Sequence, residues 1–227
     1  MNTIAEELLL LALNNKKGTI LMSASSALVY GIAGGLLVEL TLMNRLMLQN
    51  KKIIVNDESP VEDELLQQVF QVIKNDPKSR SVKYWVNRLN SRIGGRLKNK
   101  LFDRLANKGI VEKEPHHFLW VIQYYHYPLI DYNLKDAIQK RIREEIIYKT
   151  GDPEQRTAVL GSLIYACNLL NTVFPSDERR TAKKRLKQIA KNEVYGKVVS
   201  ESVQALQVAI ITSVIAATTI STSSSSS

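Results

Sequence analysis

The sequence predicts a mainly α-helical protein, a single globular helical domain with one or two small β-hairpins. Most apolar residues recur three or four positions apart, which is the spacing of a buried helix face. Two segments, 36–55 and 101–122, interrupt this pattern in the same way. Each runs from a helix pattern through a polar break into a short apolar strand, a charged turn and a second strand, so each predicts a helix followed by a hairpin.

The length and composition allow a sizeable hydrophobic core. The chain has 227 residues, of which 44% are hydrophobic and 23% charged, as in ordinary soluble domains. Its one cysteine, Cys167, lies in an apolar helix pattern and cannot form an internal disulfide. We expect a buried, inert thiol and a reducing compartment.

The N-terminal third is expected to alternate helices with short strands. Thr3 and Glu6 have the spacing of a capping box and predict the start of the first helix. A second helix is expected over about 25–45 and a strand over 52–55. The sequence SPVE at 59–62 combines a capping serine, a first-turn proline and a capping glutamate, so it predicts the start of a third helix.

The remaining helices follow from apolar patterns bounded by glycine, proline or polar residues. They are expected over residues 82–89, 96–107, 134–148, 157–173 and about 176–191. The hairpin between the second and third of these should use residues 110–112 and 118–125 as its strands. The helix over 157–173 is apolar nearly all round, which indicates a central position in the core.

The domain is expected to occupy residues 1–200, followed over 201–227 by an apolar helix pattern and a disordered serine-rich tail. The polar face of that last helix consists of Ser, Thr and Gln rather than Lys. This favours docking on the domain or on another subunit over insertion into a membrane. The N-terminus shows no signal-peptide pattern, so we expect a cytoplasmic protein.

The net charge of +9 is concentrated in the middle of the chain. Residues 1–70 carry 5 basic and 8 acidic residues, whereas residues 71–130 carry 12 basic and 4 acidic ones. Such asymmetry points to an anionic partner, either nucleic acid or a membrane surface. Improved solubility without any anionic partner is the alternative.

Six basic residues follow one another at intervals of four. They are Arg88, Arg92, Arg96, Lys100, Arg104 and Lys108. Because four residues turn a helix by about 400°, this series forms a slowly curving stripe. Guanidinium and ammonium groups bind phosphate oxygens strongly, so the stripe predicts a phosphate-binding surface. A solvated helix face without a ligand is the alternative.

The run FLWVIQYYHY at 118–127 is apolar on both faces of an extended strand. Alternation places one set of side chains on a common face: Phe118, Trp120, Ile122 and Tyr124. Neighbouring helices can cover one face of such a strand, and a second subunit can cover the other. These four residues therefore predict a homo-oligomer interface, with burial in the protein's own core as the alternative.

Nothing in the sequence supports catalysis or a metal site. His116 and His117 are neighbours on a strand, so their rings diverge, and His126 stands apart. Phosphate-loop, dinucleotide-binding and nucleophile-elbow motifs are absent. We predict a protein that is not an enzyme and needs no cofactor.

The helix–hairpin units also resemble a winged helix, which gives a nucleic-acid-binding module as the alternative function. Winged-helix readers present a polar helix to the groove and a basic wing to the backbone. The strand over 118–127 contains no Lys or Arg. Nucleic acid is therefore the less favoured partner.

The order of seven segments is similar to that of the Golgi phosphoprotein 3 family over about residues 3–200, and in particular to its compact prokaryotic members. The segments are EELLLLAL, GGLLVELTLMNRL, KKIIVNDESP, RLANKGIVEKE, FLWVIQYYHYPL, GDPEQRTAVLGSLIYA and NEV at 192–194. The resemblance implies a non-enzymatic, mostly helical domain. It also implies a peripheral membrane protein that binds phosphatidylinositol 4-phosphate, carries protein cargo and forms oligomers through its hairpin.

The family's headgroup-binding positions are only partly kept. Its two arginines on the central basic helix correspond to Gly95 and Lys98, with Arg92 and Arg96 nearby as substitutes. Together with Lys100 of the basic series, Lys98, Arg92 and Arg96 are the residues predicted to bind anionic lipid headgroups. Because the other positions lack charge, we expect affinity for anionic lipids in general and weaker selection of one phosphoinositide.

Overall fold

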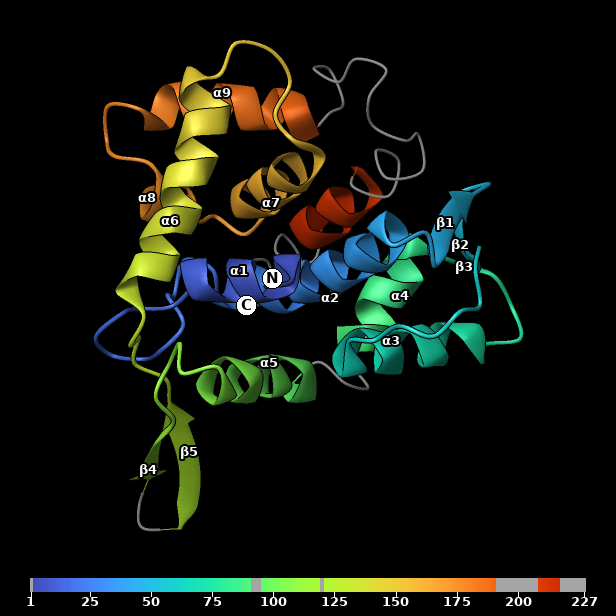
Figure 1. Cartoon of the computed structure of the whole chain (residues 1–227), viewed down its shortest axis with the longest axis horizontal. Coiled ribbons are helices and arrows are strands. Elements are labelled where there is room, and N and C mark those ends of the chain that lie inside the picture. Colours follow the sequence, from blue (N-terminus) through green and yellow to red (C-terminus); the bar gives the residue numbers. More distant parts are fainter. Residues whose placement is uncertain (1, 91–94, 119–120, 191–207, 217–227) are drawn as a thin grey trace, which may run out of the picture.

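The structure is a computed structural model that describes residues 2–90, 95–118, 121–190 and 208–216. It is mainly α-helical with two small antiparallel sheets, so the predicted fold class is confirmed. Helices α1 and α2 lie in the centre and the other helices surround them (Figure 1). The predicted interface residue Trp120 and the predicted lipid-binding residue Arg92 lie outside the described residues.

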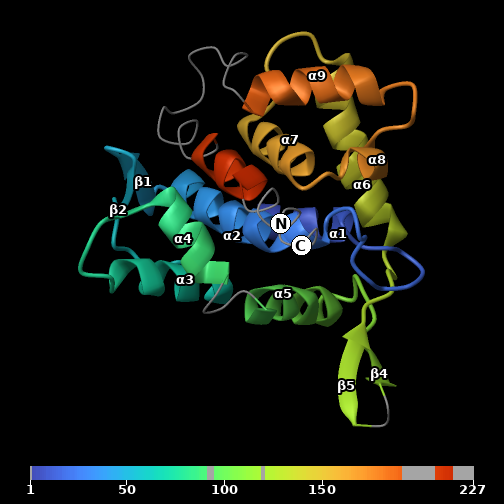
Figure 2. The ribbon, with the colours of Figure 1, turned by 180° about the vertical axis from the view of Figure 1, so that it is seen from behind.

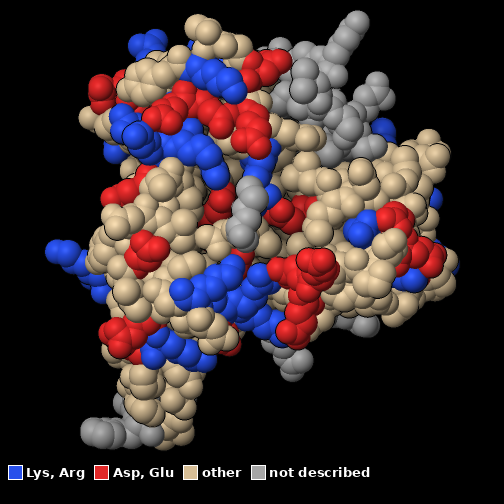
Figure 3. All heavy atoms as spheres, viewed as in Figure 1, with Lys and Arg blue, Asp and Glu red and all other residues tan. Residues whose placement is uncertain are grey.

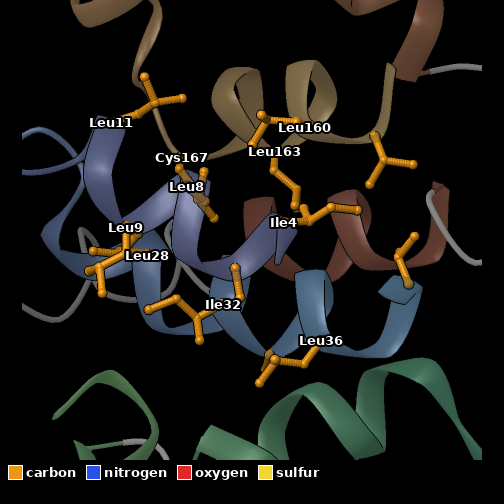
Figure 4. Packing of buried hydrophobic residues seen from close by; sticks show 14 of the residues in the cluster. Ile4, Leu8, Leu9, Leu11, Leu28, Ile32, Leu36, Leu160, Leu163 and Cys167 are labelled. Atoms are coloured by element: carbon orange, nitrogen blue, oxygen red, sulfur yellow. The ribbon is translucent and has the colours of Figure 1, made fainter. Parts of the chain in front are cut away.

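The core is built around α1 (Ile4–Leu11), all of whose residues are buried. The predicted capping box is confirmed: the Thr3 side chain accepts a hydrogen bond from the Glu6 amide, and the Glu6 carboxylate accepts one from the Thr3 amide. The helix lies between α2 (Ser25–Leu42) and α7 (Gln155–Ala166), and their leucine and isoleucine side chains interdigitate (Figure 4). Enclosure on several sides explains why every residue of α1 except Glu6 and Glu7 is apolar.

Two neighbouring glycines of α2 allow other helices to come close. A Cβ atom on Gly35 would lie 3.2 Å from the backbone nitrogen of Ala5 in α1. A Cβ atom on Gly34 would lie 2.3 Å from a side-chain methyl of Ile210. Ile210 belongs to the helix formed by residues 208–216, which therefore docks on the domain, with Ile210 and Val214 in the core.

Among the described residues, α2 alone is long and apolar enough to cross a membrane by length and composition. Of this stretch, 67% is buried inside the fold. The core helix of a soluble protein meets the same criteria.

At one end of α2, a three-stranded sheet packs beside two helices. Its strands are β1 (Leu46–Gln49), β2 (Lys52–Val55) and β3 (Arg80–Ser81), in that order and antiparallel. The helices are α3 (Glu64–Lys74), between β2 and β3, and α4 (Val82–Leu89), directly after β3.

The predicted start of α3 was wrong. The helix begins after Asp63, whose side chain accepts hydrogen bonds from the amides of Leu65 and Leu66. Ser59 instead bonds to the carboxylate of Asp57 in the preceding loop. Both are good capping residues in isolation, and contacts outside the segment decide between them.

Helix α5 (Gly95–Asn107) leads into a hairpin that projects away from the helices (Figures 1 and 2). Its strands are β4 (Glu114–Phe118) and β5 (Ile122–His126), paired so that Phe118 lies opposite Ile122. The predicted strands were misplaced, because the apolar run 118–127 turns back on itself instead of forming one strand. The segment over 110–112 pairs with residues 128–130 at the base of the hairpin.

The C-terminal helices form a layer on the opposite side of α1 from α5 (Figure 2). They are α6 (Tyr132–Arg143), the π-helical turn η2 (Glu144–Tyr148), α7, α8 (Leu170–Val173) and α9 (Arg179–Ala190). Helix α7 is buried from Thr157 to Ile164, which confirms the predicted central position. The predicted helix over 157–173 was too long, because α7 ends at Ala166 and Asn168, with a φ of +56°, separates it from α8.

Candidate functional site

Helix α5, which contains Arg96, Lys100 and Arg104 of the predicted basic stripe, has two chemically different sides. One side presents Lys100, Arg104 and Asn107 to α3. The other presents Lys98 and Phe102 to the base of the hairpin. This division follows from helix geometry, because residues three or four apart share a face and residues two apart do not.

The side facing α3 is occupied by ion pairs. Arg104 donates two hydrogen bonds to the carboxylate of Asp63, of 2.8 and 2.6 Å. Arg104 also lies 3.4 Å from the buried carboxylate of Glu6, which accepts a 2.7 Å hydrogen bond from Lys108. Lys100 donates a hydrogen bond to the side-chain oxygen of Gln68. The cations on this side therefore hold α5 against α1 and α3.

The pKa of Asp63 reflects this arrangement. Burial by itself would raise the pKa of the Asp63 carboxyl group. The hydrogen bonds from Arg104 and from the amides of Leu66 and Leu65, together with the charge of Arg104, outweigh burial and lower that pKa. Asp63 therefore stays ionised at neutral pH and cancels charge on this side of α5.

The other side of α5 borders a cleft of about 500 Å³, which we call the hairpin cleft. It is lined by residues 18–20, by Lys98, Asn99 and Phe102 of α5, and by residues 123–127. Among the described residues, no carboxylate lines it and Lys98 has no ion pair. Phe102 stacks on Tyr127 with ring centroids 4.1 Å apart and planes at 5°, which gives the cleft an aromatic wall.

The loop that borders the hairpin cleft is fixed at three points. Gly18 has a φ of +61°, and a Cβ atom there would lie 2.3 Å from the backbone nitrogen of Pro128, so only glycine fits without strain. The Gly18 carbonyl accepts a 2.8 Å hydrogen bond from the Tyr127 amide. On the far side, Lys135 of α6 donates hydrogen bonds to the Leu13 carbonyl and the Asn15 side chain, of 2.8 and 2.7 Å.

Lys135 is a buried cation, with 5% of its surface exposed. Burial lowers the pKa of its ammonium group to about 8, although the charge of Asp136 opposes that shift. Sequence reasoning missed this residue, because an isolated lysine in an amphipathic helix gives no sign of burial.

The structure separates two of the predicted lipid-binding residues. Lys98 lines the hairpin cleft, and Lys100 faces α3. Arg96 lies in the first turn of α5, and the structure describes only its backbone. Sequence reasoning missed the other residues of the cleft, above all Asn99 and Phe102.

The hairpin exposes large side chains to solvent. Val121 is 85% exposed, Tyr124 42% and Tyr125 40%. The His116 ring stacks on Tyr124 and lies against His126, with centroids 5.6 and 4.1 Å away. For Phe118 and Ile122, the other predicted interface residues, the structure gives the strand register only.

In a space-filling view, basic side chains gather over α5 and acidic ones lie beside them over the start of α3 (Figure 3). The hairpin below carries few charges on that face (Figure 3). Within the described ranges, no group of three or more His, Cys, Asp or Glu residues could hold a metal ion.

One protein family matches most of the chain. The model of the family described as Golgi phosphoprotein 3 (GPP34) matches residues 4–206. The match includes α1, the hairpin and all the helices up to α9.

Proposed function

Because the chain belongs to the Golgi phosphoprotein 3 family, we propose that it is a non-enzymatic, peripheral membrane protein that binds anionic lipid headgroups at the hairpin cleft. Lys98 is the central cation of this site. The observation that carries the proposal is that, of the residues the structure describes, Lys98 lines the cleft and no carboxylate does.

The hairpin cleft has suitable chemistry for a phosphate group. Lys98 supplies a positive charge, and Thr19, Asn99 and the backbone of Gly18 supply neutral polar groups. Lys16 and Lys17, both exposed, belong to the loop that continues into Gly18. Several cations at one surface add their weak individual attractions to an anionic bilayer.

Only part of the basic stripe is available to bind a lipid headgroup. Arg104 and Lys108 are committed to Asp63 and Glu6, so they are not available for a lipid. No observation favours the nucleic-acid alternative, since β4 and β5 contain no Lys or Arg. We therefore place membrane contact on the side of α5 that faces the hairpin.

Vesicle flotation at low salt tests the proposal. The unmodified protein should float with vesicles that contain phosphatidylserine or phosphatidylinositol 4-phosphate, with modest preference between them, and not with neutral vesicles. The triple variant Lys16→Glu, Lys17→Glu, Lys98→Glu should lower partitioning about a hundredfold, since each lysine contributes about 1 kcal/mol at an anionic surface.

A matched variant controls for net charge. Lys183, Lys184 and Lys187 are exposed on α9, away from the hairpin. Changing these three to Glu should leave flotation nearly unchanged. Equal recovery of the unmodified protein on neutral and anionic vesicles, or an equal loss in the two triple variants, would contradict the proposed site.

The exposed hairpin supports a second part of the proposal, which is self-association. Tyr124 and Tyr125 are large, partly apolar and turned to solvent on a hairpin that projects from the body. Contact between hairpins of two subunits would cover them. Assembly would also place several weak lipid sites in one particle, which would raise its overall affinity for the membrane.

A further inference from the structure

A second hollow lies far from the hairpin, between the three-stranded sheet and the helix formed by residues 208–216. It has a volume of about 650 Å³, within the range of small-molecule sites. Its lining is mostly carbon and includes Leu48 of β1, Val82 of α4, and Val208 and Ala216 of the helix. We call it the sheet groove.

The sheet groove remains open because of how the helix 208–216 is seated. Ile210 and Val214 point into the core, where Gly34 makes room for Ile210. The side of the helix that lines the groove presents small residues instead: Ala209, Thr212, Ser213 and Ala216. Larger side chains at these positions would fill the space between the helix and the sheet.

Two lysines stand at the edge of the sheet groove. Lys51 lies in the turn between β1 and β2, and Lys83 lies in the first turn of α4. Both are exposed, and neither has an ion pair with a described residue. In the part of the chain that the structure describes, no carboxylate lines the groove. Lys83 also borders an adjoining polar hollow with Tyr84 and Asn87, so this end of the groove opens beside polar groups.

We propose that the sheet groove binds a long-chain fatty acid. The hydrocarbon chain lies along the apolar lining, and the carboxylate lies at the edge between Lys51 and Lys83. An apolar groove with two unpaired cations at its mouth complements an amphiphile that has one anionic end. This site is separate from the hairpin cleft and does not depend on lipid binding there.

Displacement of a fluorescent fatty acid, 11-dansylaminoundecanoic acid, from the full chain by palmitate measures binding. We expect saturable binding of one fatty acid per chain. From laurate to palmitate, affinity should rise by up to about fourfold for each added methylene that is buried. Hexadecanol, which lacks the charge, should compete more weakly than palmitate.

Two groove variants and their controls locate the site. Thr212→Trp fills the groove and should weaken palmitate binding at least about tenfold. Ile215→Trp, on the same helix but outside the lining, should change it less than about twofold. Lys51→Glu with Lys83→Glu should weaken palmitate about tenfold and leave hexadecanol unchanged, while Lys184→Glu with Lys187→Glu should affect neither. Thermal melting of each variant confirms that it is folded.

Three results would overturn the proposal. The first is no saturable binding by the unmodified protein, as expected if another segment or subunit fills the groove. The second is binding that Thr212→Trp leaves intact while the variant is folded. The third is hexadecanol binding as tightly as palmitate, which would remove any role for the two lysines.

Discussion

Arg104 and Asp63 are 41 residues apart in sequence and share two hydrogen bonds, at the residue that caps the start of α3. The same carboxylate accepts the first amides of that helix. One side chain therefore caps α3 and fastens it to α5. Arg104, one of the six residues of the predicted basic stripe, is therefore part of the scaffold.

Replacing Asp63 with Ala should destabilise the fold by about 1–3 kcal/mol, because the variant loses a helix cap and leaves Arg104 without its main partner. Urea unfolding measures the change. Asp103→Ala is the matched control, since Asp103 pairs with Lys113 at the surface, and it should cost less than about 1 kcal/mol. Equal effects of the two substitutions would contradict the dual role of Asp63.

The buried Lys135 should make stability rise with pH in a defined window. Its folded-state pKa, about 8, lies below the ordinary value of 10.5 because burial disfavours the charged form. Between these two values the unfolded chain binds more protons than the folded one, so the free energy of unfolding should increase with pH, by up to roughly 3 kcal/mol. Chemical denaturation from pH 7.5 to 10.5 measures the slope, and Lys135→Met should be flatter by that amount. A slope unchanged by the substitution would show that Lys135 is not the group responsible.

Gly34→Ala should loosen the helix formed by residues 208–216, because the added methyl group meets Ile210. We expect a cost of about 1–3 kcal/mol from overpacking and faster hydrogen exchange in that helix. The double variant with Ile210→Ala should cost less than the sum of the two single changes, since the smaller side chain relieves the clash. Strict additivity would mean that the two residues do not meet.

The protein should be a dimer or larger at tens of micromolar, and replacing Trp120 and Tyr124 with Ser should weaken that assembly. Sedimentation equilibrium measures both. Tyr132→Ser, at another exposed tyrosine, should leave the assembly unchanged. A monomer of 25.6 kDa for the unmodified protein would disprove self-association.

The sequence correctly predicted the structural features that depend on residues close together in the chain. The capping box of Thr3 and Glu6 lies within four residues, and the structure contains it as expected. The inward faces of the helices follow in the same way from apolar periodicity: Ile138, Ile142 and Ile146 are four residues apart, and all three are buried.

The sequence-based predictions were wrong where contacts with residues distant in sequence decide which of two similar local structures forms. Asp63 caps α3 in place of Ser59 because Arg104 holds it. The hairpin strands shifted because residues 110–112 pair with 128–130. For the same reason, the sequence indicated that α5 is basic but not where its cations lie. Some of them pair with acidic residues of α1 or with the cap of α3, and another faces an open cleft.

The buried position of α1 has a consequence for synthesis on the ribosome. Glu6 meets Lys108, Glu7 meets Arg141, and the N-terminal end of α1 is held by Glu39 with Arg156. During synthesis α1 emerges before α5, α6 and α7, so it waits for the residues in and next to these helices before its charges are paired and its leucines covered. Until residue 156 has emerged, this apolar segment should be a substrate for chaperones that bind nascent chains.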